Sequence, residues 1–257
     1  MLSSNKIKFV NSLKSKKIRN KLGFFVAEGD KIVNDLINSD WEVIELFAME
    51  GWIEKNQILD LEKRTNIYPV KYDELKKISS FKTPHNVLAI VKIPNQADAF
   101  VPQPGKLYLL LENIQDPGNL GAITRTSGWY GIDSIICSPG SVDIFNPKVI
   151  QASMNAFVKV EVCYHELRIV LEQFKRKDMP VYGTFMDGKN IYETPLTSMG
   201  AILFGNESKG ISDDLIPFIK HHLHIPSNQE VGTTKVESLN IAAAVAVVCS
   251  EFRNLRK

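Results

Sequence analysis

A nearly continuous apolar segment, KLYLLLEN (106–113), constrains the fold of this chain more than any other feature. Such a run is typical of a parallel β-strand covered by helices, because neither face of that strand meets water. The segments after it alternate between strand-like and helical patterns of apolar residues. The predicted strands are 133–139, 158–164, 180–186, 201–206 and 221–226, and the predicted helices are 122–130, 147–156, 166–177, 213–219 and 238–253. This alternation predicts a doubly wound α/β domain of about 150 residues.

The N-terminal part shows a weaker alternation of the same kind, which predicts a small α/β unit. Its predicted strands are 24–29, 41–49, 67–70 and 87–94, and its predicted helices are 5–22, 30–38 and 73–78. PNQADAFVPQPG (94–105) contains three prolines and several turn-forming residues, as expected of a linker. We therefore predict an N-terminal domain over 1–94, a linker over 95–105 and a second domain over 106–257.

Several classes of protein are disfavoured by composition. The longest strongly apolar run, IAAAVAVVC (241–249), is far shorter than the roughly 20 residues that a membrane span needs. The N-terminus lacks the apolar core of a secretory signal. Cys137, Cys163 and Cys249 are widely spaced among apolar residues, and the five histidines offer no ligand spacing with them. We therefore predict reduced core thiols, no metal and a cytoplasmic location.

Positive charge gathers at the N-terminus. Residues 1–27 contain seven lysines and arginines and no acidic residue, a pattern that suits a polyanion. A solvated helix face would give the same pattern, so by itself it leaves both interpretations open. The candidate contacts to the phosphates of a nucleic acid are Lys14, Lys16, Lys17, Arg19 and Lys21.

Three polar loops follow predicted strands, where ligands bind in sheets of this kind. They span 112–126, 203–212 and 224–248. In the first, a turn over 116–119 precedes a helix that Asn119 is predicted to cap, with Arg125 less than two helical turns further on. Each loop also has a purely structural interpretation. The second lacks the spacing of a phosphate-binding GxxxxGK[ST] loop, and the first strand lacks the GxGxxG that a nicotinamide oxidoreductase needs.

Together and in this order, the loops resemble the SpoU/TrmH family of RNA ribose 2′-O-methyltransferases, within the SPOUT superfamily. DPGNLGAITRT (116–126) matches that family's DPxNxGAxxRT motif, GNESKG (205–210) its GxExxG motif, and IP (225–226) with SLN (238–240) its third motif. NPKVIQASMNAF (146–157) resembles the family's NPKxxRAS-GA segment. FFVAEGDKIVNDL (24–36) and TPHNVLAIV (83–91) look like its small substrate-binding domain, which is related in fold to ribosomal proteins that bind RNA kinks.

The resemblance implies an α/β domain with a deep trefoil knot, an exception to the usual absence of knots. It also implies a homodimer that binds S-adenosylmethionine in the knot and transfers its methyl group to RNA. Carried over to this sequence, the cofactor contacts are Gly205, Ile225 and Leu239, with Thr184, Phe204 and Asn206 as weaker candidates. The residues with a catalytic task are Asn119, Arg125, Glu207, Ser238 and Asn240.

An arginine such as Arg125 is a poor general base, because a guanidinium group does not give up its proton in proteins. We therefore hypothesise that its guanidinium clamps the neighbouring phosphate and stabilises the developing 2′-alkoxide. Glu207 would orient Arg125 or a neighbouring donor by a charge-assisted hydrogen bond.

The sequence departs from the family pattern in two places. NQEVGTTKVE (228–237) lengthens the loop that covers the cofactor, and Ser227 replaces the usual Met, so Ile225 is a less secure contact than Gly205 or Leu239. Gln151 replaces an Arg of the family, which is expected to alter a contact with RNA. Asn155 replaces a Gly, which is expected to alter a turn.

Two alternatives compete with RNA ribose methylation. One is a non-catalytic RNA-binding protein that keeps the fold, and the other is a SPOUT enzyme that methylates a base. Because many family members with an N-terminal extension act on ribosomal RNA, rRNA is favoured over tRNA as the substrate. Methylation of the same RNA that confers antibiotic resistance is a further alternative.

Overall fold

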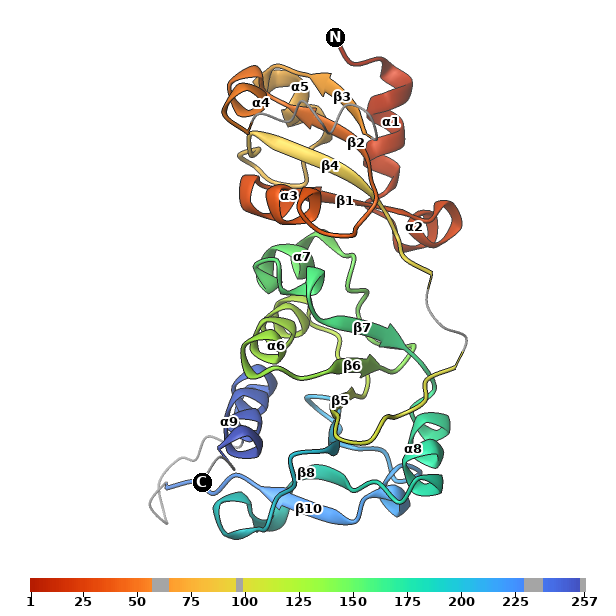
Figure 1. Ribbon diagram of the computed structural model, residues 1–257, viewed down its shortest axis with the longest axis vertical. Helices are drawn as coiled ribbons and strands as arrows, with labels where there is room; N and C mark the ends of the chain where they lie inside the picture. Colours follow the sequence, from red (N-terminus) through yellow and green to blue (C-terminus); the bar gives the residue numbers. More distant parts are fainter. Residues whose placement is uncertain (57–64, 96–98, 229–237, 255–257) are drawn as a thin grey trace. The chain divides into compact units, whose positions relative to one another are not determined.

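The computed structural model describes residues 1–56, 65–95, 99–228 and 238–254 (Figure 1). The chain forms two compact units. The first combines Met1–Asn95 with Phe145–Val158, and the second combines Gln96–Ile144 with Lys159–Lys257. The first unit's main segment therefore ends where the predicted linker begins, and residues 96–98 of that linker lie outside the described residues.

The first unit contains a mixed four-stranded sheet in the order β1-β4-β2-β3. β4 is antiparallel to β1 and β2, whereas β2 and β3 are parallel. Its elements are α1 (Ser4–Ser12), α2 (Lys16–Leu22), β1 (Phe24–Glu28), α3 (Asp30–Ile37), β2 (Val43–Ala48), α4 (Glu50–Asn56), β3 (Asn66–Pro69), α5 (Tyr72–Ile78) and β4 (Val87–Lys92). The prediction of a small α/β unit is confirmed. The single helix predicted over 5–22 is wrong, because the chain breaks into α1 and α2 around Ser15, the N-cap of α2.

An aromatic cluster joins the segment Phe145–Val158 to the rest of the first unit. The ring of Phe145 stacks on Phe25 with 4.6 Å between centroids, and Trp41 meets Phe157 edge-on at 5.8 Å. The indole nitrogen of Trp41 donates to the carbonyl of Val158 over 3.3 Å. The sequence assigns this segment to 106–257, whereas its contacts place it with the first unit.

The two departures from the family pattern also make contacts in this unit. The segment contains α7 (Pro147–Ser153) and the short 3₁₀ helix η2 (Ala156–Val158). From α7, Gln151 donates its side-chain amide to the carbonyl of Glu28 over 2.7 Å. Asn155 donates to the carboxylate of Asp35 over 2.5 Å and has a φ of +73°. Because asparagine tolerates this left-handed conformation better than most residues, it can stand where the family has glycine.

This conformation leads to a prediction about stability. Asn155→Ala removes the bond to Asp35 and places a side chain that disfavours positive φ, at a cost of about 1–2 kcal/mol for the conformation alone. Asn155→Gly loses the same bond but adopts the backbone without strain. We expect the midpoint of urea unfolding to fall in the order wild type, Gly variant, Ala variant. An Ala variant at least as stable as the Gly variant would contradict the role given to the backbone.

The second unit is built on a six-stranded, entirely parallel sheet in the order β10-β8-β9-β5-β6-β7. Its strands are β5 (Leu107–Leu111), β6 (Ser134–Cys137), β7 (Glu161–Tyr164), β8 (Val181–Asn190), β9 (Gly200–Phe204) and β10 (His221–His224). Every residue of β5 is buried, as the apolar run predicts. The prediction of a parallel α/β domain is confirmed.

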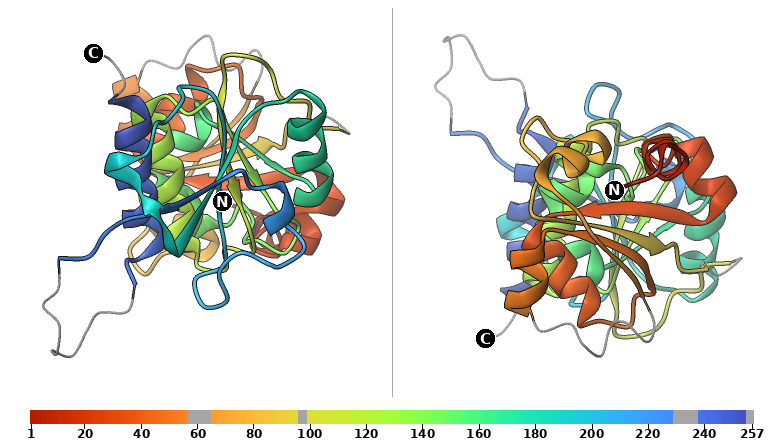
Figure 2. Two further views of the ribbon diagram at one scale, coloured as in Figure 1. Left: turned by 90° about the horizontal axis from the view of Figure 1, so that it is seen from below. Right: turned by 90° about the horizontal axis from the view of Figure 1, so that it is seen from above.

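Helices cover both faces of this sheet. They are α6 (Pro117–Tyr130), α8 (Leu167–Arg176) and α9 (Ile241–Arg253), with the short helices η3 (Ile191–Glu193) and η4 (Ile216–Phe218). α6 and α9 pack side by side on one face, and α8 lies on the other (Figures 1 and 2). Leu171 and Phe174 of α8 pack with Leu110 and Leu203 of the sheet. The helix predicted over 213–219 is wrong in extent, because only the three residues of η4 are helical.

α6 begins earlier than predicted, with a different cap. Asp116 is the N-cap residue, and its carboxylate accepts from the backbone N–H of Asn119 over 2.8 Å. Pro117 occupies the first turn, where its missing N–H costs nothing. The prediction that Asn119 caps the helix is therefore wrong. The side chain of Asn119 is instead available for other partners.

All three cysteines are buried and carry free thiols. Burial raises the pKa of Cys163 and Cys249 to about 12, which suppresses the reactive thiolate. The prediction of core thiols is confirmed. None of the helices in the described part of the chain combines the length and apolar character that a membrane span requires.

Candidate active site

The polar loops of the second unit meet at one edge of its sheet. Because all six strands are parallel, their carboxyl ends share that edge. The loop after β5 leads to Asn119, and the loop after β9 contains Glu207. Asn240, the N-cap residue of α9, comes from the third motif.

The side chains of these three residues form a hydrogen-bonded chain. The amide of Asn240 donates to Oδ1 of Asn119 over 3.0 Å, and the amide of Asn119 donates to Oε1 of Glu207 over 3.2 Å. Asn240 also accepts from the backbone N–H of Ala242 over 2.9 Å, which fixes its side chain at the start of α9. The structure thus brings together one residue from each of the three motifs.

The loop after β9 is held by its own backbone. Asn206 and Gly210 exchange two backbone hydrogen bonds of 2.9 Å, and Oδ1 of Asn206 accepts from the N–H of Ser208 and Lys209. Gly205 lies against the returning chain, so that a Cβ added there would be 2.1 Å from the backbone carbon of Gly210. Only glycine fits at that position without moving the loop.

Arg125 and Ser238 stand apart from this chain of hydrogen bonds. Both side chains are exposed, and no hydrogen bond or ion pair joins either of them to another residue in the described ranges. The donors that Glu207 contacts are therefore Asn119 and, over 3.5 Å, the side-chain amide of Asn206, rather than Arg125. Arg125 projects from α6 with its guanidinium available to a ligand.

The candidate cofactor contacts have unequal accessibility. Phe204 is buried at the end of β9, so its backbone rather than its ring is available. Thr184, which follows the stretch of β8 paired with β9, makes a long 3.5 Å contact to the carbonyl of Leu203. Ile225 is half-buried, whereas Leu239 leaves 53% of its surface exposed just before α9.

A backbone-lined loop and an exposed apolar side chain at this edge of the sheet would suit a nucleoside ligand such as S-adenosylmethionine. Because Gly210 already pairs with the backbone N–H of Asn206, the loop can offer a ligand the second lone pair of the Asn206 carbonyl, and Leu239 exposes an apolar side chain that a base could contact. Residues 229–237, which make up most of NQEVGTTKVE, lie outside the described residues. The predicted effect of this longer loop on the cofactor contacts therefore stays a prediction. In the described parts of the chain, no group of three or more His, Cys, Asp and Glu residues could hold a metal.

The basic residues at the N-terminus divide into two groups. Arg19 is only 2% exposed, and its guanidinium donates to the carbonyls of Leu13 and Lys14, both over 2.9 Å. Arg19 thus supports the junction of α1 and α2 and is not placed to reach a phosphate. Lys14 donates to the carbonyl of Ser79. Burial lowers the pKa of Lys14, and the negative charge of Glu28 offsets only part of this effect. The side chains of Lys16, Lys17 and Lys21 are exposed, and their contact with RNA stays a prediction.

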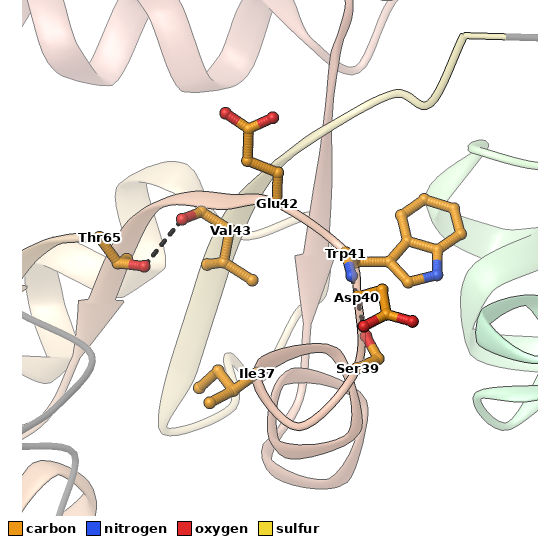
Figure 3. A pocket seen from close by; sticks show the side chains of 7 residues that line it. All are labelled: Ile37, Ser39, Asp40, Trp41, Glu42, Val43 and Thr65. Atoms are coloured by element: carbon orange, nitrogen blue, oxygen red, sulfur yellow. Dashed lines mark hydrogen bonds between the residues drawn. The ribbon is translucent and has the colours of Figure 1, made fainter. Parts of the chain in front are cut away.

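A pocket of about 400 Å³ lies in the first unit (Figure 3). It is lined by Ile37, Ser39, Asp40, Trp41, Glu42, Val43 and Thr65. None of the residues predicted to bind cofactor or RNA is among them. Its two carboxylates make it a poor place for phosphate, so this pocket does not compete with the edge of the parallel sheet.

Fold and site together define an α/β protein with a candidate ligand site at the carboxyl edge of a parallel sheet. The profile of the SpoU rRNA Methylase family matches residues 106–250, more than half of the chain. The chain therefore belongs to the SpoU rRNA methylase family. Residues 4–89 match the MRM3-like substrate binding domain.

Relatives with this organisation are found over the whole length of the chain. The 23S rRNA (guanosine(2553)-2′-O)-methyltransferase RlmP of Bacillus subtilis is 28% identical over 97% of this chain and 96% of its own. A solved structure from Porphyromonas gingivalis, assigned to the TrmH family of RNA methyltransferases, is 35% identical, with a TM-score of 0.85 over 99% of each chain. An rRNA methyltransferase of Sinorhizobium meliloti, solved with AdoMet bound, shares the fold at 24% identity, with a TM-score of 0.84 over 100% of this chain and 97% of its own.

Proposed function

We propose that this protein transfers the methyl group of S-adenosylmethionine to a ribose 2′-hydroxyl of ribosomal RNA. The hydrogen-bonded chain of Asn240, Asn119 and Glu207 carries the proposal, because it assembles the three family motifs at one site. The rRNA specificity of the Bacillus subtilis relative, which matches both units of the chain, supports rRNA over tRNA. A cytoplasmic location fits this substrate.

The residues at the site suit the two requirements of the reaction, which are in-line positioning and removal of the hydroxyl proton. When bound, S-adenosylmethionine supplies an electrophilic methyl group on a positively charged sulfur. Gly205 and Leu239 would hold it, with Ile225, Thr184, Phe204 and Asn206 as additional contacts. Glu207 orients Asn119, and Asn119 and Ser238 position the ribose.

Arg125 acts in this proposal as an electrostatic clamp. Its exposed guanidinium holds the phosphate next to the reacting ribose and stabilises the 2′-oxygen as its negative charge develops. The proton leaves to water or through that phosphate, because a guanidinium that stays protonated cannot accept it.

The trefoil knot is part of the proposal. β10 lies at one end of the sheet order, whereas α9, the next described element in the chain, packs against α6, which follows the inner strand β5. The contact of Asn240 with Asn119, which holds the start of α9 beside the loop after β5, supports a knotted path of the chain.

We also propose that the protein is a homodimer whose interface includes α6. Trp129 projects from α6 with 85% of its surface exposed, one turn beyond Arg125. Because tryptophan is enriched where a partner covers a protein surface, this exposed ring supports an interface at α6.

Trp129→Glu tests the dimer directly. A carboxylate in the centre of an apolar contact costs its desolvation, so we expect this variant to sediment as a monomer at a concentration where wild type is a dimer. Ile169→Glu is the matched control, because Ile169 is exposed on α8, which covers the other face of the sheet. A Trp129→Glu variant that stays dimeric would place the interface elsewhere.

The function is tested by mapping 2′-O-methyl groups at nucleotide resolution in ribosomal and transfer RNA, with and without this protein. We expect one ribose methyl in rRNA to depend on it. Mass spectrometry of nuclease digests distinguishes a ribose methyl from a base methyl. Calorimetric titration with S-adenosylmethionine addresses the non-catalytic alternative, which predicts no binding. Unchanged maps of both RNAs would refute the proposed reaction.

A further inference from the structure

Glu112 is a buried carboxylate to which the proposed chemistry gives no task. It is the first residue after β5 and is only 5% exposed. Its backbone N–H donates to the carbonyl of Phe204 over 2.9 Å, which extends the pairing of β5 with β9 by one step. The structure records no ion pair for Glu112 with any residue in its described ranges.

Both acceptors of Glu112 are used by one residue of the loop after β9. Its carboxylate accepts from the backbone N–H of Ser212 over 3.0 Å and from the Ser212 hydroxyl. A carboxylate suits this arrangement, because it offers two acceptor oxygens to two donors. Glu112 therefore fixes the end of the loop that contains Gly205 and Glu207.

The residue after Glu112 holds the start of the same loop. Asn113 accepts from the side-chain amide of Asn206 through its backbone carbonyl over 2.8 Å. The backbone of Asn113 has a φ of +50°, and its N–H donates to the hydroxyl of Ser138 over 2.8 Å. Two consecutive residues at the end of β5 thus hold both ends of the segment 206–212.

We infer that Glu112 is a positioning residue that holds the loop 206–212 in the conformation that binds cofactor and presents Glu207. This inference rests on the proposed function of the site. If the loop without its clamp were competent only a tenth of the time, the apparent affinity for S-adenosylmethionine would fall about tenfold.

Three variants distinguish the hydrogen bonds of Glu112 to Ser212, which form the clamp on the loop, from the negative charge of Glu112. Glu112→Ala removes both acceptors, and Ser212→Ala removes one of the two donors. Glu112→Gln removes the charge but keeps the size of the side chain. It can also keep two hydrogen bonds to Ser212, because its carbonyl oxygen can accept from the Ser212 N–H while its amide donates to the hydroxyl. We expect the Ala variant at position 112 to bind S-adenosylmethionine about tenfold more weakly, Ser212→Ala to be intermediate, and the Gln variant to stay close to wild type.

Hydrogen exchange in the free protein gives a readout that does not depend on activity. We expect backbone amides of 206–212 to exchange about tenfold faster in Glu112→Ala than in wild type, because local opening sets the exchange rate. If wild type binds no S-adenosylmethionine, the proposed function fails, while the exchange rates still test the clamp.

Glu28 provides a matched control. Glu28 is also 5% exposed, and its carboxylate also accepts from a serine hydroxyl and a backbone N–H, those of Ser79 and Ser80. Unlike Glu112, it lies in the first unit. Glu28→Ala should lower stability without changing exchange in 206–212. The inference is overturned if Glu112→Ala leaves both exchange and affinity unchanged, or if Glu112→Gln is as damaging as Glu112→Ala.

Discussion

Gly205→Ala is expected to lower methyltransferase activity by about 100-fold, the effect of misplacing a reacting group by about 1 Å. The new methyl group would lie 2.1 Å from the backbone carbon of Gly210 and 2.3 Å from the backbone nitrogen of Ile211. Backbone atoms cannot turn aside as a flexible side chain can, so the loop itself must move. That movement displaces Glu207 and the backbone groups next to the cofactor.

Calorimetry and steady-state kinetics together measure the effect at Gly205. We expect both a weaker affinity for S-adenosylmethionine and a lower kcat, because the loop contributes to the two functions. Gly51→Ala is the control, since Gly51 lies in the helix α4 and a Cβ there meets nothing within 4 Å. A Gly205→Ala variant with wild-type affinity and kcat would show that this loop does not form the site.

The parallel sheet could be predicted from sequence because its signal is local. The run 107–111 is apolar at every position, and the structure buries every one of these residues. The start of α6 could not be placed as well, because Asp116 and Asn119 are both good caps and only the backbone decides between them. Similarly, the lysines and arginines of residues 1–27 look alike in sequence, although one of them, Arg19, is buried where α1 meets α2.

The sequence proposes members of the candidate site but does not predict the contacts between them. The motifs point to Asn119, Glu207 and Asn240, but nothing in the spacing of three distant segments says which side chains touch. Glu112 went unnoticed because a charged residue at the end of an apolar strand is usually a solvated boundary. Only the fold shows that Ser212, one hundred residues further on, supplies its partners. Hydrogen bonds between loops depend on topology, which periodicity does not encode.

Arg125→Ala is expected to lower kcat by about 10²–10³-fold, the usual effect of removing one donor that stabilises developing negative charge. The affinity for S-adenosylmethionine should stay at its wild-type value, because Arg125 makes no recorded contact with the loop after β9 in the described residues. The Michaelis constant for RNA should rise, since in the proposed mechanism the guanidinium also holds a phosphate. Arg168→Ala, which removes an exposed arginine of α8, serves as the control for lost positive charge.

Arg125→Lys then decides how the arginine acts. A lysine keeps the positive charge but lacks the planar fork that binds a phosphate through two parallel hydrogen bonds. We expect its kcat to lie between those of wild type and Arg125→Ala, with no new pH dependence near neutrality, because neither side chain needs to lose a proton. A lysine variant with full activity would rule out the bidentate clamp. If kcat of Arg125→Lys rose with pH and levelled off near the ordinary pKa of a lysine, about 10, while kcat of wild type kept rising, residue 125 would be acting as a general base instead.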